Sequence, residues 1–197
     1  MSVLVQKALR LEWFLIVYNI FEAAASLAFG ILAGSIALVG FGLDSVIEVS
    51  SAFVLVWRLS APIDSEEVEK RERKALFFVG VTFLLLACYV GFESISKLIN
   101  QEAPKESIAG IVIAILSLLI MPLLGLAKRK IARQIGSRAL EADAMETMIC
   151  AYLSVILLAG LCLNLFFGWW WADPVAGLFM VSFILKEGFE TVEKSKK

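Results

Sequence analysis

Residues 34–48 read GSIALVGFGLDSVIE, and residues 136–150 read GSRALEADAMETMIC. Both stretches begin with Gly-Ser-x-Ala-Leu. Each then carries two acidic or thiol residues four positions apart, Asp44 and Glu48 in the first and Glu146 and Cys150 in the second. Residues at positions i and i+4 lie on one face of a helix. Each stretch therefore predicts a helix that presents a pair of potential ligands to one side, and two such pairs can close around one cation.

The segments around these pairs are hydrophobic enough for a lipid bilayer. Hydrophobic residues form 60% of the chain, and a helix needs about 20 apolar residues to cross the hydrocarbon core. The first segment is too long for a cleaved signal peptide. The sequence predicts an all-α membrane protein, a single domain over residues 1–197 with six transmembrane helices at Leu11–Leu32, Ile36–Leu59, Ala75–Leu98, Ile108–Ala127, Ala139–Phe167 and Trp170–Lys186.

The loops between these segments carry a strong charge asymmetry. With six spans, both termini and the loops after the second and fourth spans share one side. That side holds every Lys and Arg except Lys97 and Lys105. Positive residues favour the cytoplasmic side, so we expect both termini in the cytoplasm and the cell membrane as the location. Short basic loops are common orientation signals, and we therefore expect no nucleic acid partner.

The repeated motif falls on the second and fifth spans, which cross the bilayer in opposite directions under this topology. Antiparallel repeats of this kind are typical of transporters whose site lies near the bilayer midplane. The halves would be residues 1–100 and 101–197. The repeat is weak, because the halves share little outside the motif and the turn that follows it.

Acidic residues within the spans need a counter-charge. On translocon-based scales, an Asp at the centre of a transmembrane helix raises the free energy of membrane insertion by about 2.5–3.5 kcal/mol. No Lys or Arg lies inside a predicted span close to the motif. The missing counter-charge therefore indicates a cation that the chain does not supply itself, either a metal ion, a proton or each in turn.

The ligand types narrow the choice of metal. Asp44, Glu48 and Glu146 offer oxygen and Cys150 offers a thiolate, a mixture that suits tetrahedral Zn(II) better than Mg(II) or Ca(II). Cd(II), Fe(II), Co(II) and Mn(II) follow Zn(II) in order. The chain contains no His, so proton coupling must run through the carboxylates and the thiol. We expect the empty site to hold protons that an arriving metal ion displaces.

Three stretches resemble helices of the cation diffusion facilitator family. GSIALVGFGLDSVIE at 34–48 resembles its second helix, SRALEADAMETMIC at 137–150 its fifth, and WADPVAGL at 171–178 the opening of its sixth. The resemblance covers both halves of the family's six-helix membrane domain. It implies a homodimer that exports Zn(II) or a related divalent ion from the cytoplasm in exchange for protons, by alternating access. The metal is then the transported cargo, and no cofactor is expected.

The chain departs from the family pattern in two respects. The family places Asp or His first and Asp second in each pair, whereas this chain has Asp44 and Glu48, then Glu146 and Cys150. Cys150 is either a softer ligand that changes selectivity or a small core residue. The chain also ends about ten residues after the sixth span, so we expect the family's cytoplasmic ferredoxin-like domain, a soluble C-terminal domain, to be absent.

Other polar residues in the spans have two possible roles. Tyr18, Asn19 and Glu22 share a face of the first span and either line the ion path or form interhelical hydrogen bonds. Asp143, one turn before Glu146, is either a second-shell partner that orients the site or an entry residue. Asp173 either belongs to the ion path or caps the sixth span.

Gly30 and Gly34 form a GxxxG motif. Such a motif permits close helix packing, either in a dimer or within one subunit.

Two other functional classes compete with a transporter. One is a metal-binding membrane scaffold that moves nothing, and the other is a carboxylate-lined cation channel, which needs weak binding at several sites. An enzyme is not expected, because the sequence shows no His, no activated Ser arrangement and no phosphate-binding loop. Dependence on a pH gradient separates the exchanger from the channel and the scaffold.

Overall fold

The computed structural model describes residues 3–60 and 66–196. Within these residues the chain forms six helices: α1 (Val3–Ala33), α2 (Ile36–Ser60), α3 (Glu66–Asn100), α4 (Ile108–Ile135), α5 (Arg138–Phe167) and α6 (Ala172–Lys194). The predicted all-helical fold is confirmed for the described residues. The first five predicted spans lie inside α1 to α5, and α6 begins two residues after the start of the sixth predicted span.

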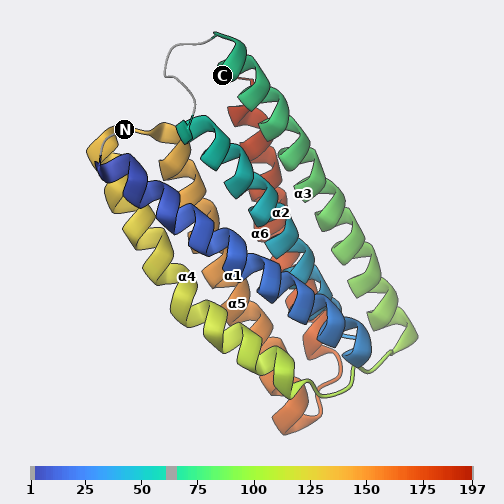
Figure 1. Cartoon of the computed structure of the whole chain (residues 1–197). Coiled ribbons are helices and arrows are strands. Elements are labelled where there is room, and N and C mark those ends of the chain that lie inside the picture. The colour runs from blue at the N-terminus through green and yellow to red at the C-terminus, as the bar shows by residue number, and fades with distance from the viewer. Residues whose placement is uncertain (1–2, 61–65, 197) are drawn as a thin grey trace.

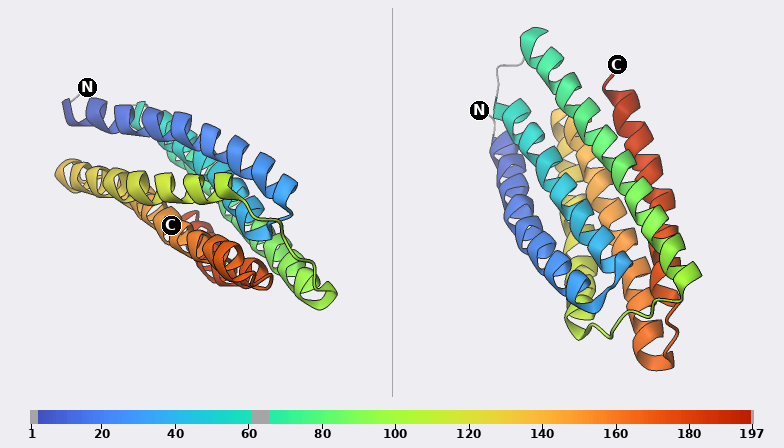
Figure 2. Two further views of the ribbon diagram at one scale, coloured as in Figure 1. Left: turned by 90° about the horizontal axis from the view of Figure 1, so that it is seen from below. Right: turned by 90° about the vertical axis from the view of Figure 1, so that its right-hand side faces the viewer.

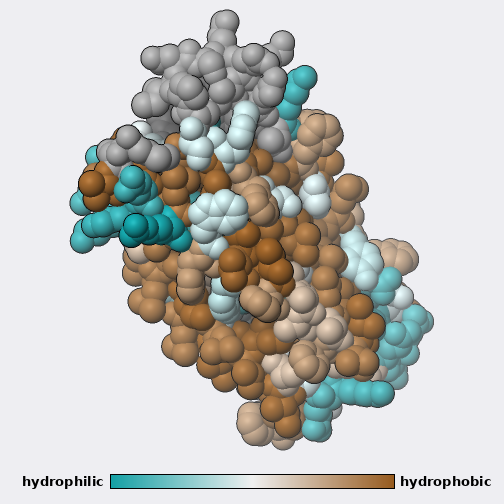
Figure 3. Space-filling model, viewed as in Figure 1, coloured by the Kyte–Doolittle hydropathy of each residue, from teal (hydrophilic) through white to brown (hydrophobic). Residues whose placement is uncertain are grey.

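Five of these helices, α1 to α5, are long and apolar enough to cross a membrane. Hydrophobic side chains cover the middle of the face seen in Figure 3, and hydrophilic ones gather towards its ends. Together with the five long apolar helices, such a surface fits contact with lipid. The chain is therefore a multi-pass membrane protein, with the lipid bilayer as its surroundings and the cell membrane as its location. A sixth span at α6 stays a prediction, because α6 carries charged residues at Asp173, Lys186, Glu187 and Glu190.

The helices pack as an elongated bundle in which neighbours in sequence run antiparallel (Figures 1 and 2). Contacts join α1 to α2, α4 to α5 and α3 to α6, and also α1 to α4 and α2 to α5. The start of α1 and the end of α6 lie at the same end of the bundle (Figure 1). The core between the helices is apolar, with Leu15, Phe41, Leu153 and Met180 fully buried.

The repeated Gly-Ser motif forms the two shortest connections of the fold. Gly34 and Gly136 have φ values of 66° and 67°, a left-handed conformation that glycine adopts without steric cost. The Ser that follows each glycine caps the next helix. Ser35 Oγ accepts a hydrogen bond from Leu38 N at 3.1 Å, and Ser137 Oγ accepts one from Leu140 N at 3.3 Å. The motif thus ends one helix and starts the next, at opposite ends of the bundle (Figure 1).

Gly30 brings α1 and α2 together within one chain. A Cβ at this position would lie 2.9 Å from both Cγ2 and the backbone nitrogen of Val39. The first glycine of the GxxxG motif therefore serves packing inside the subunit, and the second, Gly34, lies in the turn. The predicted homodimer needs a different contact surface from the one that this motif offered.

Candidate metal site

Asp44 and Glu48 lie on the buried face of α2. Their side chains follow the spacing of the helix's core residues Ala37, Phe41, Ser51 and Leu55, so the helix turns both acids inward. Asp44 is 6% exposed and Glu48 is 4% exposed. The predicted pair therefore lies inside the bundle rather than on its lipid face.

A small cavity lies beside this pair. Its volume is about 10 Å³, close to that needed for one water-sized occupant. Four acidic and four apolar side chains line it: Asp44, Glu48, Glu146, Glu187, Phe83, Ile149, Leu153 and Ile184. Three of the four predicted ligands thus border one cavity.

Glu146 and Cys150 occupy the buried side of α5. Ser51 Oγ of α2 donates to Glu146 Oε2 at 2.8 Å, which fixes the Glu146 carboxylate across the α2–α5 contact. Cys150 is a free, buried cysteine. Its thiol lies within electrostatic reach of Glu48, Glu22 and Asp44, but it does not line the cavity.

The candidate ligands do not form a complete metal-coordination shell among the described residues. No three His, Cys, Asp or Glu side chains among them are close enough to hold a metal ion together. The four predicted ligands, Asp44, Glu48, Glu146 and Cys150, gather in one region of the bundle but do not form a completed coordination shell. Their assignment as ligands stays a prediction.

Glu187 of α6 was missed by sequence reasoning. It is 3% exposed, lines the cavity and lies 3.8 Å from Lys194, measured from Oε1 to Nζ. The spacing of the sequence contained the signal. Glu187 follows Met180 and Ile184 on the buried stripe of α6, and an acid on such a stripe belongs to the interior.

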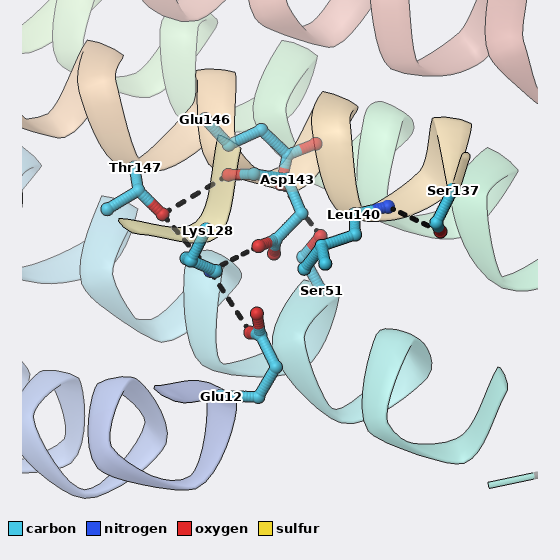
Figure 4. A network of polar contacts seen from close by, with 8 residues as sticks. All are labelled: Glu12, Ser51, Lys128, Ser137, Leu140, Asp143, Glu146 and Thr147. Carbon is cyan, nitrogen blue, oxygen red and sulfur yellow. Dashed lines mark hydrogen bonds and ion pairs between the residues drawn. The ribbon is translucent and has the colours of Figure 1, made fainter. Parts of the chain in front are cut away.

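A buried lysine lies next to the motif. Lys128 of α4 is 0% exposed, and its Nζ lies 3.0 Å from Glu12 Oε2 of α1. It also forms an ion pair with Asp143 of α5 and donates to Thr147 Oγ1 at 3.3 Å (Figure 4). The prediction that no Lys or Arg lies close to the motif was wrong.

The error has a structural cause. α4 does not end at Ala127 but continues to Ile135, so Lys128 is a helical residue and not part of a loop. It follows Ser117, Met121 and Leu124 on the buried stripe of α4, which turns its side chain into the bundle. Asp143 accordingly faces an ammonium group.

The polar face of α1 forms one hydrogen bond within the helix and one to α2. Tyr18 Oη donates to Glu22 Oε1 and Ser45 Oγ of α2 donates to Glu22 Oε2, each at 3.0 Å. Asn19 is fully buried, and its amide makes no hydrogen bond within the described residues. The structure therefore gives Glu22 a hydrogen bond that joins α1 to α2, and gives Tyr18 a hydrogen bond within α1. A role for these three residues in the ion path stays a prediction.

Asp173 is positioned at the start of α2 rather than beside the cavity. Its carboxylate accepts a hydrogen bond from Ser35 Oγ, and its Oδ2 accepts a second hydrogen bond from Ile36 N at 2.9 Å. No side chain caps the start of α6 itself. An acid at a helix N-terminus satisfies free N–H groups and interacts favourably with the helix dipole. Asp173 thus caps α2, whereas the sequence had suggested either a place in the ion path or a cap on α6.

Comparison with known proteins places the chain in a family. Residues 13–197 match the cation efflux transmembrane domain. The chain is 26% identical over 153 residues to an uncharacterized transporter of Synechocystis sp., covering 75% of this chain and 49% of the relative. It is 27% identical over 188 residues to transmembrane protein 163 of Xenopus laevis, covering 94% of this chain and 66% of the relative.

A cation-efflux pump of Shewanella oneidensis is 26% identical over 117 residues, covering 59% of this chain and 38% of the pump. The chain thus spans between about a third and two thirds of the length of these relatives. The match to the family domain covers most of the chain and confirms the resemblance seen in its helices. The chain therefore belongs to the cation efflux family, through its transmembrane domain.

Proposed function

We propose that this chain transports a divalent metal cation across the cell membrane, with Zn(II) as the favoured cargo. The observation that carries the proposal is the cavity of about 10 Å³ bordered by four buried carboxylic side chains. Buried acids in a membrane protein mark ion pathways, because each needs a cation or a proton to offset its burial. Membership of the cation efflux family supports the same function.

The ligands that we assign are Asp44, Glu48, Glu146 and Cys150. The first three border the cavity, and the Cys150 thiol lies near Glu48 and Asp44. A coordination shell is not closed among the described residues, so we propose that metal binding draws these groups together. A thiolate beside carboxylates suits Zn(II) and Cd(II) better than Mg(II) or Ca(II). Glu187 is a further oxygen donor on the α6 side.

Proton exchange follows from the same groups. Both carboxylate oxygens of Glu48 are buried and accept no hydrogen bond from the described residues. A carboxylate in that state is offset by a proton or by a cation. We therefore propose that protons and the metal ion occupy the site alternately, with alternating access between an inverted pair of three-helix halves. The name of the Shewanella relative, a cation-efflux pump, supports export from the cytoplasm. A homodimer is part of the proposal.

Flux through reconstituted protein tests this function. We expect Zn(II) uptake into proteoliposomes to depend on an imposed pH gradient and to be lost in Asp44→Asn, which keeps the shape of the side chain and removes its charge. Glu106→Gln is the matched control, because Glu106 is an exposed acid outside the cavity.

Other results would support a different function for this chain. Zn(II) flux that is the same with and without the pH gradient would indicate a channel. Zn(II) binding with no flux would indicate a metal-binding scaffold. Equal loss of flux in Asp44→Asn and Glu106→Gln would contradict the assignment of the cavity as the site.

A further inference from the structure

Lys128 sits in an acidic pocket built by three helices. Glu12 comes from α1, Lys128 from α4, and Asp143 and Thr147 from α5 (Figure 4). Glu12 and Lys128 are both 0% exposed and Asp143 is 4% exposed. Buried ions are costly unless they are neutralised by partners. The pocket therefore depends on the ammonium group for its stability.

The pocket holds two carboxylic side chains and one ammonium group. When both acids are ionised, the ammonium offsets one of them, and a proton or a further cation is needed to offset the other. Neither carboxylate of Glu12 nor of Asp143 accepts a hydrogen bond from the described residues, although both form ion pairs with Lys128. Asp and Glu carboxylates are ligands that Zn(II) binds, and the hydroxyl of Thr147 adds an oxygen donor beside them. A divalent ion would neutralise both acids where the ammonium neutralises one.

The pocket adjoins the proposed transport site. Asp143 and Glu146 are three residues apart on α5, and they face different partners. Asp143 meets Lys128, whereas Glu146 meets Ser51 and borders the cavity (Figure 4). Lys128 is also within electrostatic reach of Glu48. The ammonium thus contacts Glu12 and Asp143, one helical turn away from the Glu146 that borders the cavity.

We propose that Lys128 is a tethered cation that occupies a second divalent-ion site, formed by Glu12, Asp143 and Thr147, and thereby confines the cargo to the cavity at Asp44, Glu48 and Glu146. This inference rests on the proposed function, because it concerns where the transported ion binds. Lys128 does not bind the metal ion itself; its ammonium group fills the place that a metal ion would take between Glu12 and Asp143. Removal of its charge opens the second site to a metal ion.

The number of Zn(II) ions bound per chain tests the inference directly. We expect Lys128→Gln to bind about one more Zn(II) per chain than the wild type in equilibrium dialysis with radioactive Zn(II), since the freed acids gain a divalent partner. Lys128→Arg retains the tethered charge and should keep the wild-type number. Lys130→Gln is the matched control, because Lys130 is an exposed lysine on the same helix.

A triple variant separates the second site from any effect on the first. In Glu12→Gln with Lys128→Gln and Asp143→Asn, the pocket has no charge, and the additional Zn(II) should disappear. Thermal unfolding in detergent gives an independent readout, because an ion that binds only the folded state raises the unfolding temperature. Zn(II) should stabilise Lys128→Gln more than it stabilises the wild type or the triple variant.

The outcomes distinguish the two proposals. A wild-type protein that binds no Zn(II) would overturn the proposed function and this inference with it. Wild-type binding without a gain in Lys128→Gln would overturn only this inference. A Lys128→Gln protein that does not fold with or without Zn(II) would also overturn it, because the second site predicts rescue by the metal.

Discussion

Cys150 is the proposed ligand on which we expect metal selectivity to depend most. It is the fourth residue of the repeated pattern, it is 1% exposed, and its thiol lies near three acids although it does not border the cavity. A thiolate is a soft ligand and prefers Zn(II) or Cd(II), while a carboxylate prefers harder ions such as Mn(II). The ligand role and the packing role of Cys150 therefore predict different metal preferences after substitution.

Replacement of Cys150 tests this preference. We expect Cys150→Asp to shift transport from Cd(II) towards Mn(II), because it exchanges sulfur for oxygen at the site. Cys150→Ala should lower Zn(II) affinity by about tenfold or more, since loss of even an outer-shell partner costs about that much. Initial uptake rates over a range of metal concentrations provide the measurement.

The chain supplies its own controls for this experiment. Cys88 and Cys162 are the other free cysteines, and neither borders the cavity, so Cys88→Ala and Cys162→Ala should leave metal preference unchanged. A Cys150→Ala protein with wild-type affinity and selectivity would show that the thiol only fills space in the core.

Single side chains also show the limit of sequence reasoning. Asp44, Glu48 and Glu146 could be selected as candidate ligands because each is an acidic residue inside a predicted apolar helix, where acidic residues are rare. Lys128 and Glu187 were not, because each follows an apolar run and resembles a charge at a membrane boundary. Helical spacing places both on buried stripes. Periodicity therefore carried more information about these two residues than hydropathy did.

The beginning of α2 is held by a residue from another helix. Asp173 of α6 accepts hydrogen bonds from Ser35 and Ile36, which lie 138 and 137 positions away in sequence. Local sequence cannot reveal such a partner, because nothing near Asp173 specifies which helix end it meets. The presence of six helices, in contrast, followed from hydrophobic composition and segment length, and the two Gly-Ser turns explain where four of them begin or end.

Loss of the Asp173 carboxylate should destabilise the bundle. We expect Asp173→Ala to lower the unfolding free energy by about 1–3 kcal/mol, the penalty for leaving buried donors without a partner. For a chain of this size that corresponds to about 2–4 °C in Tm per kcal/mol. Thermal unfolding followed by tryptophan fluorescence in detergent measures the shift.

Ser182→Ala provides the comparison on the same helix. Ser182 is exposed and its hydroxyl donates only to Phe179 O within α6, so its removal should change Tm little. Equal melting of Asp173→Ala and the wild type would refute the capping role.

The bundle as a whole predicts a definite membrane topology. The start of α1 and the end of α6 lie at one end (Figure 1), and the basic residues gather on the side that holds the termini. With six spans, both termini face the cytoplasm. With α6 lying outside the bilayer, as five spans would require, the termini would face opposite sides.

Cysteine labelling distinguishes these arrangements. Lys7, Lys105 and Lys196 are exposed, and each can be replaced by Cys in a background with Cys88→Ser and Cys162→Ser and with the buried Cys150 retained. An impermeant maleimide should label Lys105→Cys in intact cells. It should label Lys7→Cys and Lys196→Cys only after permeabilisation. Labelling of the two terminal positions from opposite sides would contradict six spans.

The bond between Asp173 and α2 has a mechanical consequence. It fastens the start of α6 to the start of α2, so tilting of α6 against α2 has its fulcrum there. Glu187 lies fourteen residues further along α6, a lever arm of about 21 Å at the helical rise of 1.5 Å per residue. A tilt of about 5° would then displace Glu187 by about 2 Å while leaving the fulcrum in place. The acid on the α6 side of the cavity would thus approach or leave the α2 pair, while Met180 and Ile184 on the same stripe of α6 shift against the core.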